Sequence, residues 1–268
     1  MTSPVVIVTG SSRGIGRETA RELARRGATV VLNGRSADRL NETLTTLRAD
    51  LPQASFSAVA CDISTEPGAQ ELVRHTLETW SRVDGLINNA GVSMRGAIGD
   101  LQAKTLDKLT SGNVSSAVLP TVAALPELLK TGGGVVFVST VAAIHGFPGV
   151  SLYSATKAAV GTFAESLTAE VSHHGVHVGL VLLGFVENDP DKTTLGADGR
   201  AFHHERRAMQ SQTAAAQAIA RALLRRKRRT ITVGAGRLLD VAHRLAPGLV
   251  SRVLARSGGR LHAVDEGR

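Results

Sequence analysis

Tyr153 is the only tyrosine of the chain, and Lys157 follows it four positions later. Residues 151–160 have helical composition, and positions i and i+4 of a helix share a face, so the phenol and the ammonium can point into one site. The pKa of a free tyrosine is about 10, and a cation within about 4–6 Å lowers it. The pair therefore suits proton transfer to or from a carbonyl or alcohol oxygen, although a surface Tyr/Lys pair on an ordinary helix has the same spacing.

A glycine-rich turn near the N-terminus supplies an independent signal. Residues 4–9 form a short apolar run, typical of a strand buried on both faces, and lead into Gly10, Gly14 and Gly16 and then a helical stretch. Glycines let the backbone approach a phosphate, and a helix N-terminus contributes N–H donors for its charge. The spacing Gly-x-x-x-Gly-x-Gly differs from the usual dinucleotide fingerprint, but its place in the first strand–turn–helix predicts a nucleotide site.

Strand and helix patterns alternate along the chain. The predicted strands are 4–9, 28–33, 56–60, 84–88, 133–139, 176–183 and 230–234. The predicted helices are 14–26, 37–50, 66–80, 101–130, 152–173 and 213–226. This alternation predicts one α/β domain of Rossmann type, a doubly wound parallel β-sheet with helices on both faces and the cofactor across the carboxyl ends of the strands. Residues 184–212 are expected to form a mobile loop with a short helix.

Five elements in this order and spacing resemble the classical short-chain dehydrogenase/reductase family over residues 4–190. They are the turn at 9–16, Asp62 after the third strand, Asn88-Asn89-Ala90-Gly91 after the fourth, Asn113, and the Tyr153/Lys157 pair. The resemblance implies an NAD(P)-dependent oxidoreductase that interconverts an alcohol and a carbonyl compound, with residues 184–212 covering the substrate. It also implies a homodimer or homotetramer and no metal site.

The same resemblance assigns roles to particular residues. Tyr153 would give or take the proton, Lys157 would lower its pKa and bind the nicotinamide ribose, and Thr140 would orient the substrate oxygen. Asn113 would hold a water that relays protons to the lysine. The residues implied in cofactor binding are Gly10, Ser12, Arg13, Gly14, Ile15, Gly16, Arg35, Asp62, Ile63, Asn89, Ala90, Gly91, Tyr153, Lys157, Gly184, Val186 and Asn188.

Three positions depart from the family pattern. Thr140 stands thirteen residues before the tyrosine, where serine is usual; it keeps the hydroxyl but adds a methyl that narrows the pocket. The usual Pro-Gly after the sixth strand is Leu183-Gly184, and Asn188 replaces a threonine. These changes bear on efficiency and substrate range more than on the reaction.

The end of the second strand indicates the cofactor. Folds that take NAD usually place an acid there for the ribose 2′-hydroxyl, whereas folds that take NADP leave room and an arginine. Here the strand ends in Asn33-Gly34-Arg35 with no acid, and Arg13 lies in the glycine turn. An arginine fork suits a phosphate, so NADP(H) is predicted in preference to NAD(H), although two solvated loop arginines are the alternative.

Composition fits one soluble domain. The 268 residues are 43% hydrophobic, which is enough to bury a core. Cys61 is the single cysteine, so no internal disulfide can form, and a reducing compartment fits. No apolar stretch is long enough for a membrane span and no signal peptide precedes the first strand, so a cytoplasmic location is expected.

Positive charge is concentrated at the C-terminal end. Residues 200–268 hold fifteen Lys and Arg against four Asp and Glu, a net charge of +11, whereas the first 199 residues carry −3. The run Arg225–Arg229 can bind an anionic membrane or nucleic acid, or can be a solvated helix end. Nucleic acid is disfavoured because aromatic residues for base stacking are nearly absent and no nucleic-acid motif occurs.

A basic extension is expected after the catalytic domain, which we place at residues 1–236, with the extension at 237–268. Residues 237–256 have the pattern of two short amphipathic helices split by Pro247-Gly248. Such a hairpin is typical of a membrane-surface element, which would make the protein a peripheral membrane protein. A lid over the pocket or an oligomer contact is an equal alternative.

The sequence thus predicts an NADP(H)-dependent oxidoreductase that interconverts a secondary alcohol and a ketone or aldehyde. The basic tail resembles that of family members that handle lipophilic or steroid-like substrates at membranes, and this resemblance implies a lipophilic substrate. Two other classes stay open at this point. One is a non-enzymatic NADP(H)-binding sensor or scaffold, favoured only by the Ser-to-Thr change at Thr140. The other is a membrane-anchored protein that acts through its basic tail.

Overall fold

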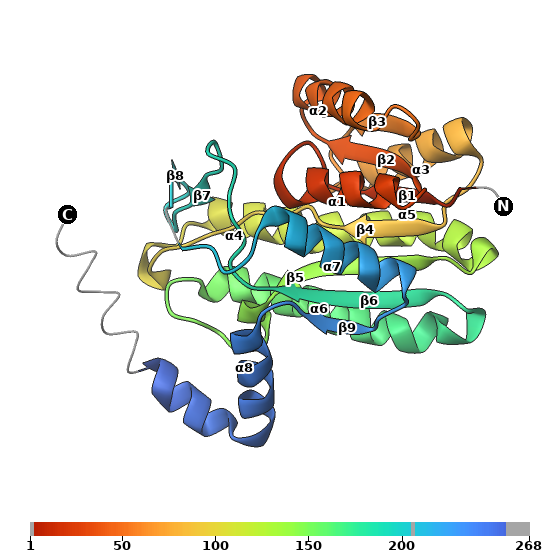
Figure 1. The fold of residues 1–268 in the computed structure, drawn as a ribbon. Helices are drawn as coiled ribbons and strands as arrows, with labels where there is room; N and C mark the ends of the chain where they lie inside the picture. The colour runs from red at the N-terminus through yellow and green to blue at the C-terminus, as the bar shows by residue number, and fades with distance from the viewer. Residues whose placement is uncertain (1–2, 205–206, 256–268) are drawn as a thin grey trace.

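The computed structural model describes residues 3–204 and 207–255. Seven parallel strands form one sheet in the order β3-β2-β1-β4-β5-β6-β9 (Figure 1). They are β1 (Val5–Val8), β2 (Thr29–Gly34), β3 (Phe56–Ala60), β4 (Gly85–Asn88), β5 (Gly134–Thr140), β6 (His177–Leu183) and β9 (Arg229–Ile231). All seven predicted strands are therefore confirmed, although the last one ends at Ile231 and not at residue 234.

Six of the described helices cover the two faces of this sheet: α1 (Gly14–Arg25), α2 (Ala37–Asp50), α3 (Glu66–Trp80), α5 (Ser116–Thr131), α6 (Ser151–Val171) and α7 (Gln212–Leu224). The structure also contains α4 (Ala103–Thr110), α8 (Gly234–Leu245), which projects away from the sheet (Figure 1), and the short segments η1 (Ile98–Asp100), η2 (Ser111–Ser115), η3 (Val141–Ala143) and η4 (Ser172–His174). The predicted doubly wound architecture is confirmed.

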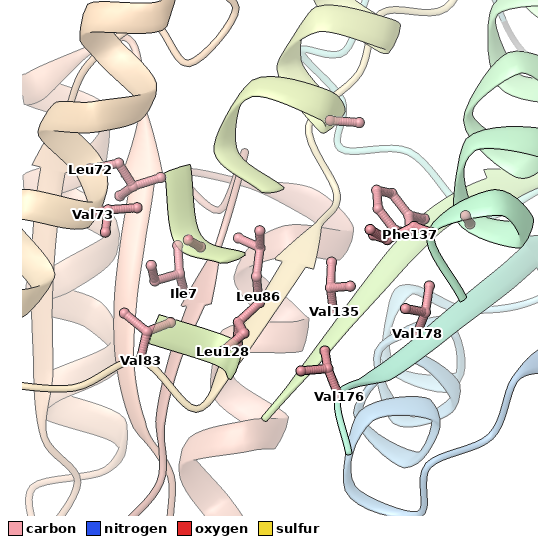
Figure 2. Close-up of a cluster of buried hydrophobic side chains, with 14 of the residues drawn as sticks. Ile7, Leu72, Val73, Val83, Leu86, Leu128, Val135, Phe137, Val176 and Val178 are labelled. Carbon is pink, nitrogen blue, oxygen red and sulfur yellow. The ribbon is translucent and has the colours of Figure 1, made fainter. Parts of the chain in front are cut away.

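Two apolar layers hold the three-layer sandwich together. Strand residues such as Ile7, Val135 and Phe137 pack on one face against α3, α5 and α6, for example at Leu72 and Leu128 (Figure 2). Alternate residues of the same strands pack on the other face against α1, α2 and α7. Strands buried on both faces are continuously apolar, which is why the sequence shows runs and not alternation there.

The strand order reverses beside β1, which has β2 on one side and β4 on the other. The connections from β1 and β4 therefore leave in opposite directions and open a crevice at the carboxyl edge of the sheet. The glycine turn follows β1, and Asn89-Ala90-Gly91 follows β4. Both motifs thus lie at the place where this fold binds dinucleotides.

The predicted helix at 101–130 is observed as an unbroken helical run from residue 103 to residue 131, with a π turn that was not predicted. The run consists of α4, the π-helical turn η2 and α5. Asn113, at the centre of η2, hydrogen-bonds the backbone of Val92, so its side chain is fixed by a tertiary partner and the helix adjusts around it. Isolated π turns inside helices occur mostly at functional sites.

The predicted short helix within 184–212 is wrong for the described part of that segment. A small hairpin of β7 (Thr194–Leu195) and β8 (Ala201–Phe202) forms instead. Gly199 turns the chain at φ +81°, and Asp198 accepts a hydrogen bond from the Arg200 N–H at 3.0 Å. Turn-forming Asp and Gly residues therefore outweigh the local helix pattern.

The C-terminal segment forms two helices, as predicted. The first is α8, and residues 247–255 form the second, with the break at Ala246 (Figure 1). Pro247 begins the second helix, because a proline fits the first position of a helix, where its missing N–H is not needed. The predicted end at Arg256 lies outside the described residues. None of the described helices is long and apolar enough to cross a membrane.

Candidate active site

The turn after β1 has a conformation that requires glycine. Gly10 has φ +62°, and a Cβ there would lie 2.8 Å from the Ala90 Cα. A Cβ on Gly16 would lie 2.2 Å from the Gly10 carbonyl oxygen. Because neither position can carry a side chain, the backbone at the start of α1 stays bare and open to a ligand.

Hydrogen bonds fasten the end of β4 to this turn. Thr9 Oγ1 accepts from the backbone N–H of Asn89 at 3.0 Å and of Ala90 at 3.1 Å. The Asn89 side chain donates to the carbonyl oxygens of Thr9 at 3.0 Å and Gly10 at 3.1 Å. Asn89 is therefore a positioning residue for the glycine turn as well as part of the cleft wall.

A groove of about 410 Å³ runs along this edge of the sheet. The predicted cofactor residues that line it are Gly10, Ser12, Arg13, Gly14, Ile15, Gly16, Arg35, Asp62, Ile63, Asn89, Ala90, Gly91 and Asn188. Gly184, Val186, Tyr153 and Lys157 are not among the residues that line it. A Cβ on Gly184 would lie 2.7 Å from Val233, and Val186 is buried in the core.

The groove fits a dinucleotide. The N-terminus of α1 opens onto it at Gly14, which provides backbone N–H groups and a positive dipole end for a diphosphate. Asn188 Oδ1 is buried without a hydrogen-bond partner among the described residues, as expected of an amide that faces the position of a polar ligand.

Three arginines border one end of the groove: Arg13, Arg35 and Arg39. Arg13 Nη1 lies 2.7 Å from Asp191 Oδ2, in a partly exposed pair. Asn33 also lines the groove; it is largely buried, and its amide donates to the Val59 carbonyl oxygen at 3.3 Å. The end of β2 therefore presents no acid to the groove.

Asp62 is fixed at the wall of the groove after β3. Its Oδ1 accepts hydrogen bonds from the Ser64 hydroxyl at 2.7 Å and from the Ser64 N–H at 3.0 Å. The hydrogen bond from the Ser64 hydroxyl is the main cause of the lowered pKa of the Asp62 carboxyl. The carboxylate is thus ionised and held as an acceptor.

Cys61 also lines the groove, but it is not a nucleophile. Burial raises the pKa of its thiol to about 11, with the nearby carboxylates of Glu71 and Asp62 adding to the effect. The thiol stays protonated near neutrality and has little reactivity.

Lys157 places a buried ammonium next to the groove. The residue is only 7% exposed, and Nζ donates to the Val138 carbonyl oxygen at 3.1 Å. Burial lowers the pKa of Lys157 to about 8, with the charge of Lys192 adding to the effect. A Cβ on Gly91 would lie 3.1 Å from this Nζ, so the glycine keeps the space beside the ammonium open.

Asn113 is fully buried and bonded to its protein neighbours. Oδ1 accepts from the Val92 N–H at 2.7 Å, and Nδ2 donates to the Val92 carbonyl oxygen and to Thr156 Oγ1, both at 3.0 Å. These bonds join η2, the segment after β4 and helix α6. Asn113 therefore positions the elements around Lys157.

Tyr153 and Lys157 project from adjacent turns of α6, as the sequence predicts. Tyr153 is half-buried against an apolar cluster of Met94, Leu109, Leu195 and Ala197.

Thr140 lies at the end of β5 and keeps a hydroxyl that can serve the substrate. Its Oγ1 accepts a hydrogen bond from the Ala142 N–H at 3.3 Å. That bond uses a lone pair of the oxygen and leaves its hydrogen for donation to another acceptor.

Several residues of this site lie outside the predicted set. Ser139 donates to the Lys157 carbonyl oxygen at 3.0 Å, and Thr156 accepts from Asn113, so both hold α6 in place. Further residues outside the predicted set line the groove, among them Asp189 and Lys192 from the loop after β6 and Gln212 from the start of α7. Ser139 and Thr156 could have been found as neighbours of motif residues, but the other three belong to no motif.

Comparison with known proteins agrees with this geometry. Residues 4–196 match the family model described as short chain dehydrogenase. The chain is 33% identical over 260 residues to dehydrogenase/reductase SDR family member 7B of Bos taurus, covering 94% of this chain and 80% of that protein. The chain belongs to the short-chain dehydrogenase/reductase family and is an NAD(P)-dependent oxidoreductase that acts on hydroxyl or carbonyl groups.

Solved structures show the same fold. A short-chain dehydrogenase from Streptomyces avermitilis aligns at a TM-score of 0.79 with 25% identity, covering 99% of this chain and 98% of that one. L-sorbose reductase from Gluconobacter frateurii, complexed with NADPH and L-sorbose, aligns at 0.67 with 27% identity, covering 70% and 71%. Similar chains have been solved with NAD and with NADP, so the comparison leaves the choice of dinucleotide open.

The buried ammonium has a consequence for stability that can be measured. Burial lowers the pKa of Lys157 to about 8 from 10.5. Below pH 8 the lysine is protonated in both the folded and the unfolded protein, and the buried charge makes folding less favourable. Between pH 8 and 10.5 the folded protein gives up this proton before the unfolded chain does, so the penalty disappears as the pH rises. The free energy of unfolding of the wild type should therefore rise by about 3 kcal/mol relative to Lys157→Met over this range. Denaturant unfolding at several pH values measures the difference. A constant difference would contradict the buried charge.

Proposed function

We propose that this protein is an NADP(H)-dependent oxidoreductase that interconverts a secondary alcohol and a ketone, or an aldehyde and its alcohol, on a lipophilic substrate. The main support for the proposal is the position of Tyr153 and Lys157 on adjacent turns of α6. Tyr153 lies one turn before the buried Lys157, at the edge of the dinucleotide groove. When bound, the dinucleotide supplies or accepts the hydride.

Residues of this chain would then bind the substrate oxygen and transfer the proton to or from it. Tyr153 would give the proton to this oxygen in reduction and take it in oxidation, and the nearby ammonium of Lys157 would favour the phenolate form. The Thr140 hydroxyl would donate a hydrogen bond to the same oxygen. Lys157 would also bind the nicotinamide ribose.

Asn113 would sustain the proton relay through position. Its side-chain oxygen and nitrogen are engaged with Val92 and Thr156. We therefore propose that it fixes the π turn and α6 around the path between Lys157 and solvent. The other proposed cofactor residues would contact the dinucleotide along the groove, and Asn188 would lie toward its nicotinamide end.

The preference for NADP(H) is supported by the charges at one end of the groove. Arg13, Arg35 and Arg39 border it, and the buried Asn33 leaves no carboxylate at the end of β2. Arginine forks bind a 2′-phosphate well, whereas a ribose 2′-hydroxyl calls for an acceptor.

A lipophilic substrate is supported by the surroundings of Tyr153. Met94, Leu109, Leu195 and Ala197 form an apolar cluster against which Tyr153 packs, and two of these residues belong to the 184–212 loop. These four side chains are buried, and a substrate whose oxygen approaches the Tyr153 phenol would lie beside this apolar cluster, which favours apolar substrate surface.

We also propose that the protein is a homodimer or homotetramer in the cytoplasm. Large apolar side chains are exposed on neighbouring helices, with Val122 of α5 59% exposed and Leu106 of α4 42% exposed. Burial of such side chains between identical subunits is favourable. The single cysteine suits a reducing compartment.

A screen of ketones and aldehydes with NADPH, followed by the loss of absorbance of the reduced cofactor, tests the reaction. Apolar ketones should be reduced faster than polar ones of equal size. Tight binding of NADPH without turnover on any carbonyl compound would instead support the sensor alternative.

Removal of the phenol hydroxyl should abolish proton transfer and leave the groove intact. Tyr153→Phe should bind NADPH with unchanged affinity and lose at least about a hundredfold in kcat, which is a typical general-acid contribution. Cofactor fluorescence measures binding and absorbance measures turnover. Near-normal turnover would remove Tyr153 from the mechanism.

Thr140→Ser should keep or raise kcat/KM. Serine retains the hydroxyl and the acceptor for the Ala142 N–H, and it lacks the methyl that narrows the pocket. Thr140→Val, which has a similar shape without the hydroxyl, is the matched control and should lose activity. A large loss with serine would show that the role of Thr140 is misplaced.

Reversal of the charge of Arg35 should reverse cofactor preference. Wild type should bind NADPH more tightly than NADH, and Arg35→Glu should bind NADH more tightly because a carboxylate repels the 2′-phosphate. Arg25→Glu makes the same charge change outside the groove and should leave the ratio unchanged. Equal affinities of the wild type for both cofactors would refute the arginine argument.

A further inference from the structure

The two C-terminal helices present an unusually exposed apolar surface. We call Leu238, Val241, Leu245, Leu249 and Val253 the tail face; their exposures are 71%, 53%, 81%, 61% and 57%. The first three lie one turn apart on the same side of α8, and the other two lie one turn apart on the helix at 247–255. Helix α8 extends away from the sheet (Figure 1), whereas Ser251, Leu254 and Ala255 of the second helix line a cavity with residues between 142 and 158. Large apolar side chains that stay exposed on neighbouring helices mark an interaction site.

The opposite side of α8 is already fixed to the body. A Cβ on Gly236 would lie 2.5 Å from Val141, which shows how closely the helix approaches the segment after β5. His243 Nδ1 lies 3.2 Å from His145 Nδ1, and Arg237 Nε donates to the Ile231 carbonyl oxygen at 3.1 Å. The tail face therefore lies on the side of α8 that faces away from these contacts with the body.

Positive charge surrounds the tail face. Arg237, Arg244 and Arg252 are exposed on the same two helices. Asp240 is the only acidic residue between positions 206 and 264, and it is paired with Arg229 at 2.7 Å and with Arg244 at 3.1 Å. The Arg229 contact joins the exposed run 225–229 to α8. The acid near the tail face is thus neutralised, and the excess charge is basic.

We propose that the tail face docks on an anionic lipid bilayer. Leucine and valine side chains would enter the boundary between headgroups and acyl chains, while the arginines would contact anionic headgroups. The charge complementarity favours this occupant over a second copy of the chain, because two faces of net positive charge repel. It also favours lipid over nucleic acid, which gains nothing from exposed leucines; residues 207–255 contain no Phe, Tyr or Trp for base stacking.

The position of the tail relative to the groove gives membrane docking a function. In a parallel sheet all carboxyl ends lie at one edge, and α8 leaves the sheet from the carboxyl end of β9, the edge that carries the groove. A docked protein would hold its substrate opening close to the bilayer. This last step rests on the proposed function, since it concerns the delivery of a lipophilic substrate, whereas docking itself does not depend on it.

Sedimentation of the full chain with lipid vesicles tests the proposal. At low salt the protein should sediment strongly with vesicles of phosphatidylcholine and phosphatidylserine and only weakly with phosphatidylcholine alone. Added salt should release most but not all of it, because screening weakens only the charge contribution. Two variants separate the apolar from the basic contribution: Leu238→Gln/Leu245→Gln removes apolar side chains of the tail face, and Arg244→Gln/Arg252→Gln removes basic side chains beside it. Each should lower the partition coefficient by about tenfold or more.

Matched controls separate docking from folding and from catalysis. Ile98→Gln changes an apolar side chain that is 62% exposed outside the tail and should leave vesicle binding unchanged. All variants should retain NADPH affinity, which shows that a loss of vesicle binding is not a loss of fold. If docking fails while turnover persists, only the membrane proposal falls.

Three outcomes would overturn the proposal. One is equal sedimentation of the wild type and Leu238→Gln/Leu245→Gln. Another is a drop in oligomer mass with this variant, measured by light scattering, which would make the tail face a subunit contact. The third is competition by duplex DNA that removes all of the vesicle binding, which would make the surface a nucleic-acid site.

Discussion

The burial of one ammonium group governs the architecture of the active site. Lys157 is 7% exposed, and its Nζ donates to the Val138 carbonyl oxygen at 3.1 Å. A buried charge costs free energy unless it is compensated, so its pKa falls to about 8. A cation held in this state can stabilise developing negative charge strongly, because the surrounding dielectric is low.

The neighbouring elements are arranged around this cation. Gly91 leaves room beside it, since a Cβ there would lie 3.1 Å from Nζ and 3.0 Å from the Asn113 side-chain oxygen. Asn113 ties the segment after β4 to α6, and the helix between α4 and α5 becomes a π turn at that point. Ser139 holds the Lys157 backbone from β5. The strand, the turn and the helix therefore meet at one functional group.

Much of this could be predicted from the sequence, because the physical signals are local. The alternation of strand and helix patterns predicted the seven strands, and the glycines of the first turn predicted the edge that binds the dinucleotide. The Tyr153/Lys157 pair was found by its spacing, whereas Asn113 was found by the resemblance to the family. Most residues implied by the family pattern in cofactor binding line the groove, but Gly184, Val186, Tyr153 and Lys157 do not; the chain after β6 packs on Val233 and the core.

What could not be predicted depends on tertiary contacts. The π turn at Asn113 arises from hydrogen bonds to Val92, far away in the chain, and composition does not reveal it. The β7–β8 hairpin forms where a helix was expected, because a glycine turn and pairing with the segment near Met94 decide the conformation. Asp189 and Lys192 reach the groove only through the path of this loop.

The central claim is that the groove and the Tyr153/Lys157 pair carry out hydride transfer and do not merely hold a dinucleotide. The most direct measurement uses NADPH that carries deuterium on the transferable positions of C4, with an apolar ketone and the wild-type protein. The account predicts that the alcohol product carries the deuterium on its carbinol carbon, as seen by mass spectrometry. Protein that binds the labelled cofactor and yields no deuterated alcohol from any ketone or aldehyde would contradict it.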